Sequence, residues 1–376
     1  MLMTILHAVL VLVAVWLISG TLLNFSKHPH WYIRGWDFPR VLVAVLSSVV
    51  GLVYAIGFHD RWWDWALIGG LLFVVARQLY LIYPYTKLAR QSVKPSTMPP
   101  GEHSFRLLIS NVLMENDNHD LWLKVIREAN PDIVVAVEVD AAWDKAIAAL
   151  EGDYRFCVRR PQDNYYGIVI YSRLAFDGEP EVRFRVQDDV PSVRLMFELR
   201  DRQKVRLHAL HPRPPEPLRD QSSAPRDAEL VMLGKEIAKH ERAVPTIVCG
   251  DLNDVAWSFT TQLFLRLSRL LDPRRGRGTY NSFNAKSRLF RFPLDHVFHS
   301  DEFHLIDLRV LPYVGSDHFP VLIELACEPD AARRAQPEST PRATDHEDAE
   351  EIIEEQEERQ SEGTEKGHAG TGSGHA

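Results

Sequence analysis

The chain has 376 residues, 45% hydrophobic and 10% aromatic, which is enough to bury a core in one large domain or two ordinary ones. Its three cysteines, Cys157, Cys249 and Cys327, are far apart, which excludes a disulfide framework and a Cys-x-x-Cys metal site. The formal net charge is −8, but residues 328–376 alone hold fourteen acidic and five basic side chains, so the rest of the chain is close to neutral. A near-neutral body argues against binding of nucleic acid through a strongly basic surface.

Three long apolar runs occupy the first part of the chain. Residues 5–23 and 41–58 contain no Asp, Glu, Lys or Arg, and residues 65–83 contain only Arg77. A helix needs roughly twenty apolar residues to cross a bilayer, so each run predicts a transmembrane helix, and residues 1–85 form a membrane region whose partner is the lipid bilayer. A cleaved signal peptide is disfavoured, because no basic residue precedes the first run and two more runs follow. Helices buried in a soluble core are the other alternative.

The pattern of the chain changes after the third run. Residues 86–103 contain three prolines and one glycine and predict a linker. Over residues 104–327, short apolar runs alternate with amphipathic stretches, which predicts one α/β domain with sheets covered by helices. The expected strands are FRLLISNV, IVVAVEV, GIVIYS, SVRLMFELR, KVRLHALH, TIVCGD, LDHVFHS and PVLIELA, and the expected helices are DLWLKVIREANPD and RDAELVMLGKEIAKHE.

The last segment, residues 328–376, is acidic and then rich in glycine, with almost no aliphatic side chains. Such a composition buries too little apolar surface to offset the entropy of ordering, so it predicts a disordered tail. A short acidic helix around residues 349–359 would have no obvious surface to pack against.

Polar side chains collect at the ends of the expected strands. In chain order they are Asn111, Glu138, His211, Asp251, Asn253, Asp295, Asp317 and His318. An acid inside a buried strand, as Glu138 is expected to be, is costly unless it is paired or binds a cation. Any one of these residues could be a cap, a turn residue or a satisfied core histidine. Together, on strands that could share one sheet edge, they predict a functional site.

The residue types indicate the chemistry of that site. Oxygen ligands without cysteine favour Mg²⁺ or Mn²⁺ over Zn²⁺. The acid and amide of Asp251 and Asn253 suit the orientation of a water molecule and a phosphoryl oxygen. The pair Asp317 and His318 offers a carboxylate for metal or water and an imidazolium for developing negative charge. The constellation therefore predicts hydrolysis of a phosphoester.

Residues 104–327 resemble the endonuclease/exonuclease/phosphatase superfamily, the group of DNase I, the abasic-site endonucleases, inositol-polyphosphate 5-phosphatases and neutral sphingomyelinases. The segments ISNV, PDIVVAVEV, YYGIVIYSR, HALHPRPP, CGDLND, PLDHVF and GSDHFPV stand in the order of that family's motifs. The resemblance implies a four-layer α/β sandwich, in which two mainly antiparallel sheets pack face to face with helices outside.

The resemblance also implies roles for single residues. Asn111, Glu138 and Asp317 are metal-site residues for Mg²⁺ or Mn²⁺, with Glu138 as the principal ligand. Asp251 activates or positions the attacking water, and Asn253 holds the phosphate.

Two histidines complete the implied site. His318 stabilises the pentacovalent transition state and is oriented by Asp295, whereas His211 is the second active-site histidine of the DNase I and sphingomyelinase branches. Tyr166, in the segment YYGIVIYSR, is expected to bind substrate. The sequence departs from none of the core motifs, so a non-enzymatic membrane scaffold is disfavoured.

A basic stretch leads into Asp295. Between Asp272 and Asp295 the sequence has six basic residues and no acid: Arg274, Arg275, Arg277, Lys286, Arg288 and Arg291. Such a loop would attract a polyanionic substrate or anionic headgroups, and its three arginines at 274, 275 and 277 are expected to bind substrate. The alternative is a solvated surface loop.

The combination of a membrane region with this domain, together with the segment HPRPP, resembles a bacterial branch that includes teicoplanin-resistance-type membrane proteins. That resemblance implies a lipid-linked phosphate such as a polyprenyl phosphate as substrate. A membrane-tethered nuclease is the alternative, because many relatives cut nucleic acid. The near-neutral body and the acidic tail disfavour it.

The distribution of Lys and Arg predicts the sidedness of a multi-pass protein of the cell membrane. The first loop holds Lys27, Arg34 and Arg40, the segment after the third run holds Lys87, Arg90 and Lys94, and the second loop holds Arg61 alone. The excess of positive charge places the catalytic domain in the cytoplasm, and unpaired cysteines agree. The resemblance to the polyprenyl-phosphate branch favours the outer face instead.

Overall fold

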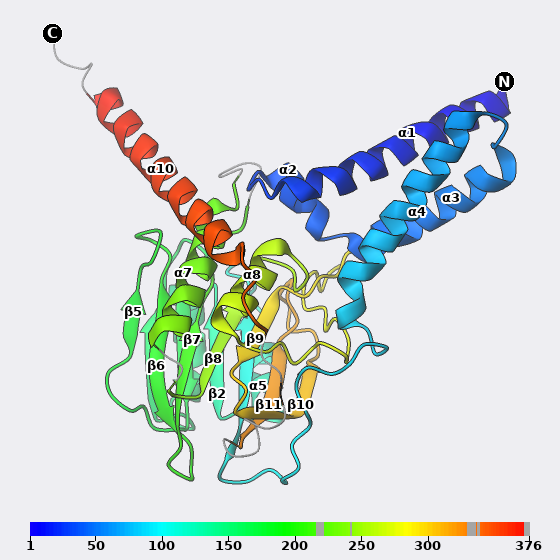
Figure 1. Cartoon of the computed structure of the whole chain (residues 1–376). Helices are drawn as coiled ribbons and strands as arrows, with labels where there is room; N and C mark the ends of the chain where they lie inside the picture. Colours follow the sequence, from blue (N-terminus) through cyan, green and yellow to red (C-terminus); the bar gives the residue numbers. More distant parts are fainter. Residues whose placement is uncertain (216–221, 241–242, 329–335, 337–338, 372–376) are drawn as a thin grey trace. The chain divides into compact units, whose positions relative to one another are not determined.

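The computed structural model of the chain divides into two compact units (Figure 1). The first unit contains Met1–Gln91, Pro215–Ser222 and Arg274–Thr279, and the second contains Ser92–Pro214, Ser223–Pro273 and Tyr280–Ala376. The structure describes residues 1–215, 222–240, 243–328, 336 and 339–371.

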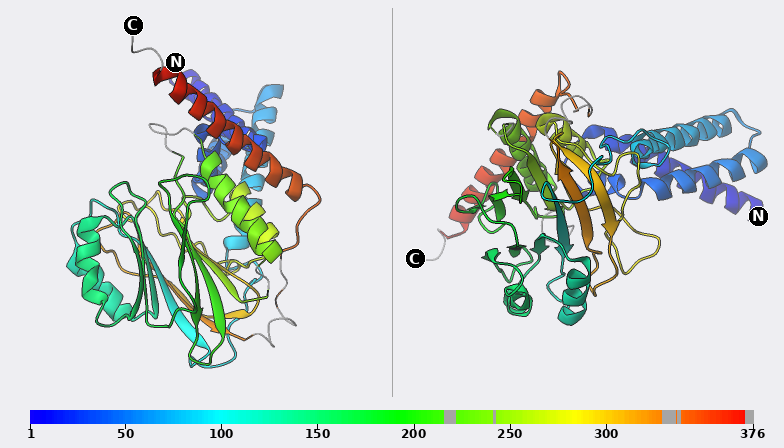
Figure 2. Two further views of the ribbon diagram at one scale, coloured as in Figure 1. Left: turned by 90° about the vertical axis from the view of Figure 1, so that its left-hand side faces the viewer. Right: turned by 90° about the horizontal axis from the view of Figure 1, so that it is seen from below.

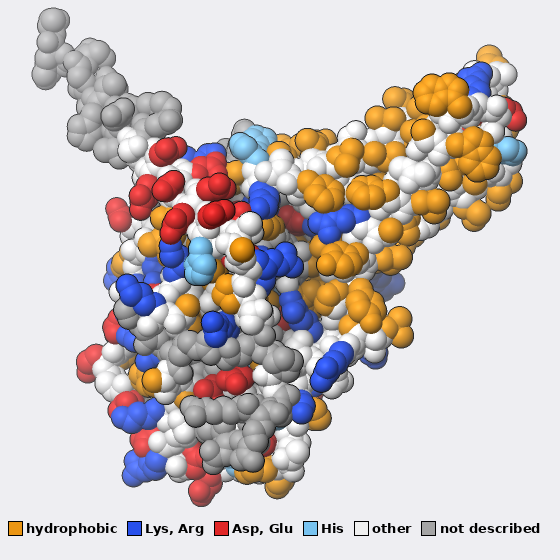
Figure 3. Space-filling view, in the orientation of Figure 1, with side chains coloured by type: hydrophobic (Ala, Val, Ile, Leu, Met, Phe, Trp, Pro, Cys, Tyr) orange, Lys and Arg blue, Asp and Glu red, His pale blue; other side chains and the backbone are white. Residues whose placement is uncertain are grey.

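Three long apolar helices form most of the first unit: α1 (Leu2–Leu23), α3 (Arg40–Gly57) and α4 (Trp62–Ile82). They coincide with the three predicted runs, and each is long and apolar enough to cross a membrane. Between α1 and α3 lie the short helices η1 (Asn24–Ser26), α2 (Trp31–Arg34) and η2 (Gly35–Asp37), and η3 (Tyr83–Tyr85) follows α4. Figure 3 shows hydrophobic side chains over the outside of these helices, which is the distribution expected where lipid replaces water.

Polar contacts lie inside this helical unit. The Tyr54 hydroxyl donates to Asp64 Oδ1 (2.7 Å), and His7 Nε2 lies 2.7 Å from the same hydroxyl. Farther along the helices, Arg40 Nη1 donates to Gln78 Oε1 (2.9 Å). These contacts join α1, α3 and α4 and satisfy side chains that lipid could not.

Two sheets form the centre of the second unit. The first has six strands in the order β10–β11–β1–β2–β4–β3, and the second has five in the order β5–β6–β7–β8–β9. Their bounds are β1 (Ser104–Asn111), β2 (Ile133–Val137), β3 (Phe156–Arg160), β4 (Ile168–Ser172), β5 (Glu181–Arg183), β6 (Ser192–Glu198), β7 (Lys204–Ala209), β8 (Thr246–Asp251), β9 (Asp295–His299), β10 (Phe303–Val310) and β11 (Val321–Cys327). Each sheet has one parallel pair, β1 with β2 and β7 with β8, and the other pairs are antiparallel.

Helices cover the outer face of each sheet (Figure 2). The helices are α5 (His119–Ala129) and α6 (Ala141–Ile147), followed by η4 (Ala148–Leu150), on the first sheet, and α7 (Ala224–His240) and α8 (Phe259–Ser268) on the second. Between the sheets lies a core to which β1 contributes Leu107 and Ile109, and to which β7 and β8 contribute Leu207 and Ile247. This confirms the predicted four-layer sandwich of two mainly antiparallel sheets.

The predicted linker is corrected in its second half. Residues 92–103 belong to the second unit, where Leu305 of β10 donates its N–H to the Lys94 carbonyl (3.0 Å) and accepts from the Ser96 N–H (2.9 Å). Val93 is fully buried in the core between the sheets. Burial of this valine and backbone pairing with an edge strand order a segment whose prolines suggested a free linker.

The prediction of a disordered tail is wrong for the helix α10 (Asp345–Thr371). Ala349, Ile352 and Ile353 lie on one face of this helix, at the spacing of neighbouring turns. They pack against Val231 of α7 and Leu263 and Leu267 of α8. These three side chains provide the apolar contact that the acidic composition of the segment did not indicate. Within the predicted tail, residues 329–335, 337–338 and 372–376 lie outside the described residues.

A buried acid in α7 predicts a pH-dependent stability. Glu229 is 4% exposed, and its Oε1 has no hydrogen-bond partner among the described residues. Burial raises the pKa of Glu229 to about 7, against an opposing effect of Arg185. Because the folded state holds this proton more tightly than the unfolded chain, stability should fall as the pH rises from about 4.5 to about 7. The shift corresponds to about 3 kcal/mol.

We therefore expect Glu229→Gln to raise the midpoint of urea unfolding at pH 8 and to leave it nearly unchanged at pH 4, measured on the full-length protein in detergent. The control is Glu236→Gln on the same helix. The Glu236 carboxylate pairs with Arg183 and Arg185, so its loss should lower the midpoint at pH 8. Equal midpoints at pH 8 for the wild type and Glu229→Gln would contradict the prediction.

Candidate active site

The two parallel strand pairs bring the predicted polar residues together. Asn111 ends β1, Glu138 follows β2, His211 follows β7 and Asp251 ends β8. The Asn111 amide joins the sheets, since Nδ2 donates to Glu138 Oε1 (2.7 Å) and to Asp251 Oδ2 (3.0 Å). The site is therefore shared by two facing sheets, rather than by one sheet edge.

Glu138 lies outside the strand in which it was predicted. β2 ends at Val137, and Glu138 has a left-handed backbone with φ of 63°. That conformation is uncommon for a residue with a side chain and is typically retained at functional positions. Burial raises the pKa of Glu138 to about 7, although the hydrogen bond from Asn111 opposes the shift. A nearby cation would restore the carboxylate.

His318 and the carboxylates beside it form the most strongly charged contact. His318 Nδ1 lies 2.8 Å from Asp295 Oδ2, and Nε2 lies 3.4 Å from Asp251 Oδ2. Burial lowers the pKa of His318, but Asp251 and Asp295 outweigh it and raise that pKa to about 10. Burial likewise opposes ionisation of Asp251, but His318 and His211 lower its pKa. At neutral pH His318 is therefore an imidazolium beside Asp251 and Asp295, although burial raises the pKa of Asp295 itself.

His211, the second histidine of the site, is neutral rather than charged. His211 Nε2 lies 3.8 Å from Asp251 Oδ2 and 3.9 Å from Glu138 Oε1. Burial lowers the pKa of His211 to about 4, so the ring is neutral at pH 7. Its Nδ1 has no hydrogen-bond partner among the described residues. The site thus combines a charged and a neutral imidazole, whose environments separate their pKa values.

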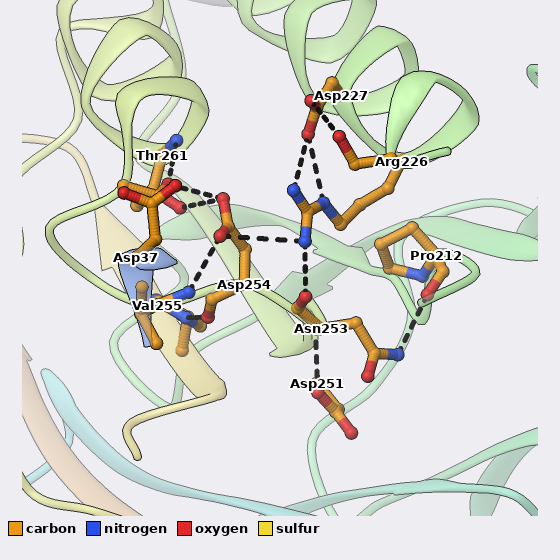
Figure 4. Close-up of polar contacts among 12 residues, drawn as sticks. Asp37, Pro212, Arg226, Asp227, Asp251, Asn253, Asp254, Val255 and Thr261 are labelled. Carbon is orange, nitrogen blue, oxygen red and sulfur yellow. Dashed lines mark hydrogen bonds and ion pairs between the residues drawn. The ribbon is translucent and has the colours of Figure 1, made fainter. Parts of the chain in front are cut away.

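The turn after β8 depends on a glycine and on a left-handed asparagine. A Cβ on Gly250, where φ is 141°, would come within 1.9 Å of the Leu210 carbonyl oxygen, so only glycine fits. Asn253, with φ of 51°, donates its N–H to Asp251 Oδ1 (2.9 Å) and its Nδ2 to the Pro212 carbonyl (3.0 Å; Figure 4). The segment GDLND thereby fixes the Asp251 carboxylate from its own backbone.

Two more predicted residues lie at this site. The Tyr166 ring is buried, with its centroid 5.6 Å from that of His211. Asp317 is half-buried, and its charge raises the pKa of both Glu138 and His318.

The three predicted substrate-binding arginines belong to the first unit, whereas the other predicted site residues belong to the second. The guanidinium carbons of Arg274 and Arg275 are 6.0 Å and 5.9 Å from the Tyr85 ring centroid, and Arg277 Nη2 donates to Gln91 Oε1 (3.1 Å). Arg274 is buried, unlike a guanidinium on a solvated loop. Their binding of substrate stays a prediction.

The prediction omitted several residues that contact the site. The Ser316 hydroxyl donates to the Asn111 carbonyl (2.9 Å) and accepts from the His318 N–H (2.9 Å). The Phe283 ring lies 4.9 Å from His318, and the Arg213 guanidinium carbon 5.1 Å from the Tyr166 ring. Ser316 and Arg213 stand inside the segments GSDHFPV and HALHPRPP, which the prediction used for other residues, whereas nothing in the local sequence marks Phe283.

The donor atoms fit a hard divalent cation. Glu138, Asn111 and Asp251 offer oxygen ligands, and Asp295 Oδ1 is buried without a hydrogen-bond partner among the described residues. Asp251, Asp295 and His318 also present ligand atoms within 4.8 Å of one another. As an imidazolium, however, His318 has no lone pair for a metal ion. The oxygen donors of Glu138, Asn111 and Asp251 are therefore the better fit for a divalent cation.

One family model and many solved structures match the chain. The model of the Endonuclease/Exonuclease/phosphatase family matches residues 108–318. The structure of humanized D. rerio TDP2 is similar at 15% identity, covering 59% of this chain and 99% of that one, with a TM-score of 0.50. The human Nocturnin catalytic domain with bound sulfate anion is 15% identical over 65% of this chain and 98% of its own, with a TM-score of 0.49. No curated protein matches the chain. Likeness at such identity shows the fold alone.

Proposed function

The chain belongs to the Endonuclease/Exonuclease/phosphatase family, and on that premise we propose that it is a membrane-anchored phosphoesterase that uses Mg²⁺ or Mn²⁺ and hydrolyses a lipid-linked phosphate ester. Hydrolysis of phosphoester bonds with a divalent metal ion is the activity of this family. The membrane anchoring in this proposal rests on three apolar helices, each long enough to span a bilayer, in the same chain as the active site.

The cluster supports in-line attack of water on phosphorus. Glu138 and Asn111 would hold the divalent cation, which would supply positive charge to a phosphoryl oxygen and lower the pKa of a bound water. Asp251, kept anionic by His318, suits the orientation of the attacking water. His318, as an imidazolium, would donate a hydrogen bond to the charge that develops on phosphorus oxygens. Asp295 holds that ring in place from the other side.

A loop beside the site supports a substrate at a lipid surface. The loop runs from Phe283, whose ring lies 4.9 Å from His318, to Phe292. At its tip, Leu289 is 78% and Phe290 52% exposed, and Lys286 and Arg288 are exposed next to them. Exposed apolar side chains with basic neighbours suit the interface of an anionic bilayer.

We expect the double substitution Leu289→Ser and Phe290→Ser to lower hydrolysis of a phospholipid in anionic vesicles about tenfold or more, because full burial of each side chain in an apolar phase is worth about 1.5–3 kcal/mol. Hydrolysis of a small soluble phosphoester should stay within about twofold of the wild type. The control is Leu121→Ser, which removes an exposed leucine from α5. Efficient cutting of DNA together with no hydrolysis of polyprenyl diphosphate or phospholipid would replace this proposal with a nuclease.

The excess of Lys and Arg in the first loop and after the third helix supports a cytoplasmic position for the active site. The exposed Cys157 offers a test, since a membrane-impermeant maleimide should label it only in permeabilised cells. Labelling in intact cells would place the site on the outer face.

A further inference from the structure

Resting on the hydrolysis proposed above, the geometry of the turn after β8 points to Arg226 of α7 as a positioning residue for that reaction. Its guanidinium holds the Asn253 carbonyl, and through it the turn that carries Asp251. Arg226 stands outside every segment used in the family resemblance, and Figure 4 shows its contacts with Asn253 and Asp254 in the turn after β8.

The guanidinium is buried and its direction is set by α7 itself. Arg226 is 1% exposed, and its Nε and Nη2 donate to Asp227 Oδ1 at 3.0 Å and 2.8 Å. The Ser223 hydroxyl, one helical turn earlier, donates to the other oxygen of Asp227 (2.7 Å). This arrangement aims Nη1 at the Asn253 carbonyl oxygen, 2.6 Å away. The planar fork of an arginine can make these bonds at once.

The Asn253 residue is consequently held at three places. Its carbonyl accepts from Arg226, its side-chain amide donates to the Pro212 carbonyl, and its N–H donates to Asp251 Oδ1. Its left-handed φ of 51° is the conformation in which these three contacts coexist. Release of the carbonyl would let this residue relax, and the N–H that orients Asp251 would move with it.

The next residue is tied to the same charge. Arg226 Nη1 lies 3.6 Å from Asp254 Oδ1, and Asp254 Oδ2 accepts from the Thr261 hydroxyl of α8 (3.1 Å). The Asp254 carbonyl oxygen lies 2.8 Å from His296 Nε2. Taking an ion pair out of water costs desolvation energy, which an apolar side chain of similar volume would avoid. What Arg226 supplies, and an apolar side chain would not, is the orientation that its hydrogen bonds impose on the turn.

The test uses the full-length protein, a small chromogenic phosphoester and Mn²⁺. Arg226→Lys keeps the charge but removes the fork, so we expect kcat to fall at least tenfold while KM stays within about twofold. The matched control is Arg266→Lys on α8. Arg266 also donates to an aspartate through Nε and Nη2, at 2.8 Å and 2.9 Å, but its partner is Asp345 of α10. This control should lower the thermal midpoint and leave kcat unchanged.

A double-mutant cycle separates positioning from a purely structural role. If Arg226 acts through Asp251, adding Arg226→Lys to Asp251→Asn should lower kcat by less than about twofold further. Losses that multiply, or a wild-type kcat in Arg226→Lys, would overturn the inference. Should Arg226→Lys fail to fold by circular dichroism, Asp227→Asn takes its place, because it retains the arginine and loosens its anchor. For Asp227→Asn we expect kcat to fall about threefold or more, and we expect no such fall when the change is added to Asp251→Asn. An unchanged kcat in Asp227→Asn overturns the inference.

Discussion

Substitution of Glu138 by Gln is expected to lower kcat for phosphoester hydrolysis by about three orders of magnitude while the protein stays folded, because the cation it would hold supplies several kcal/mol of transition-state stabilisation. Gln has nearly the same shape and can still accept the Asn111 hydrogen bond, but it offers no negative charge to a cation. Because burial raises the pKa of Glu138 to about 7, the carboxylate needs such a cation to be fully ionised at neutral pH.

Two measurements accompany this substitution. Calorimetric titration with Mn²⁺ should show weaker binding to Glu138→Gln than to the wild type, and EDTA should abolish wild-type turnover. Glu229→Gln is the control, because it makes the same chemical change at a buried acid of α7 outside the cluster. Full wild-type activity in EDTA would exclude the metal-dependent mechanism.

Asp251→Asn is expected to lower kcat by about two orders of magnitude or more, with little change in KM. The carboxylate is fully buried and lies within 3.4 Å of the His318 imidazolium, which keeps it anionic and able to orient a water. Asn preserves the volume and can still accept from the Asn253 N–H, so the loss should be specific to the charge. Asp345→Asn, which breaks the buried pair with Arg266, is the control. A loss confined to KM would mean that Asp251 binds substrate.

The parts of the fold that were predictable from sequence are those where burial is nearly complete. β1, β2 and β8 are buried along almost their whole length, so they appear in the sequence as continuous apolar runs. β3 is exposed over much of its length, and β5 has only three residues, so neither has an apolar pattern that distinguishes it from a loop. The site residues at the strand ends were recognisable from sequence because a carboxylate or imidazole directly after a buried strand is costly to bury unless it is paired or binds a ligand.

The errors arose where tertiary contacts outweigh local composition. The acidic segment of α10 is ordered by three apolar side chains whose binding surface lies on α7 and α8, more than eighty residues away in sequence. Glu138 was assigned to a strand because its neighbours are apolar, yet the backbone turns at that residue to bring the carboxylate to Asn111. Arg226 resembles any helical arginine until the turn after β8 is seen against it.

The pairing of β1 with β11 has a consequence for synthesis. Ser104 lies opposite Ala326 and Ile109 opposite Val321, so the neighbour of β1 on one side is made more than two hundred residues after β1 itself. Contacts so distant in sequence close slowly and only after the intervening chain is available. The apolar helices at the start of the chain leave the ribosome long before this pairing, and we expect membrane insertion to precede formation of the first sheet. Until β11 emerges, β1 keeps an open backbone edge of the kind that pairs with other chains.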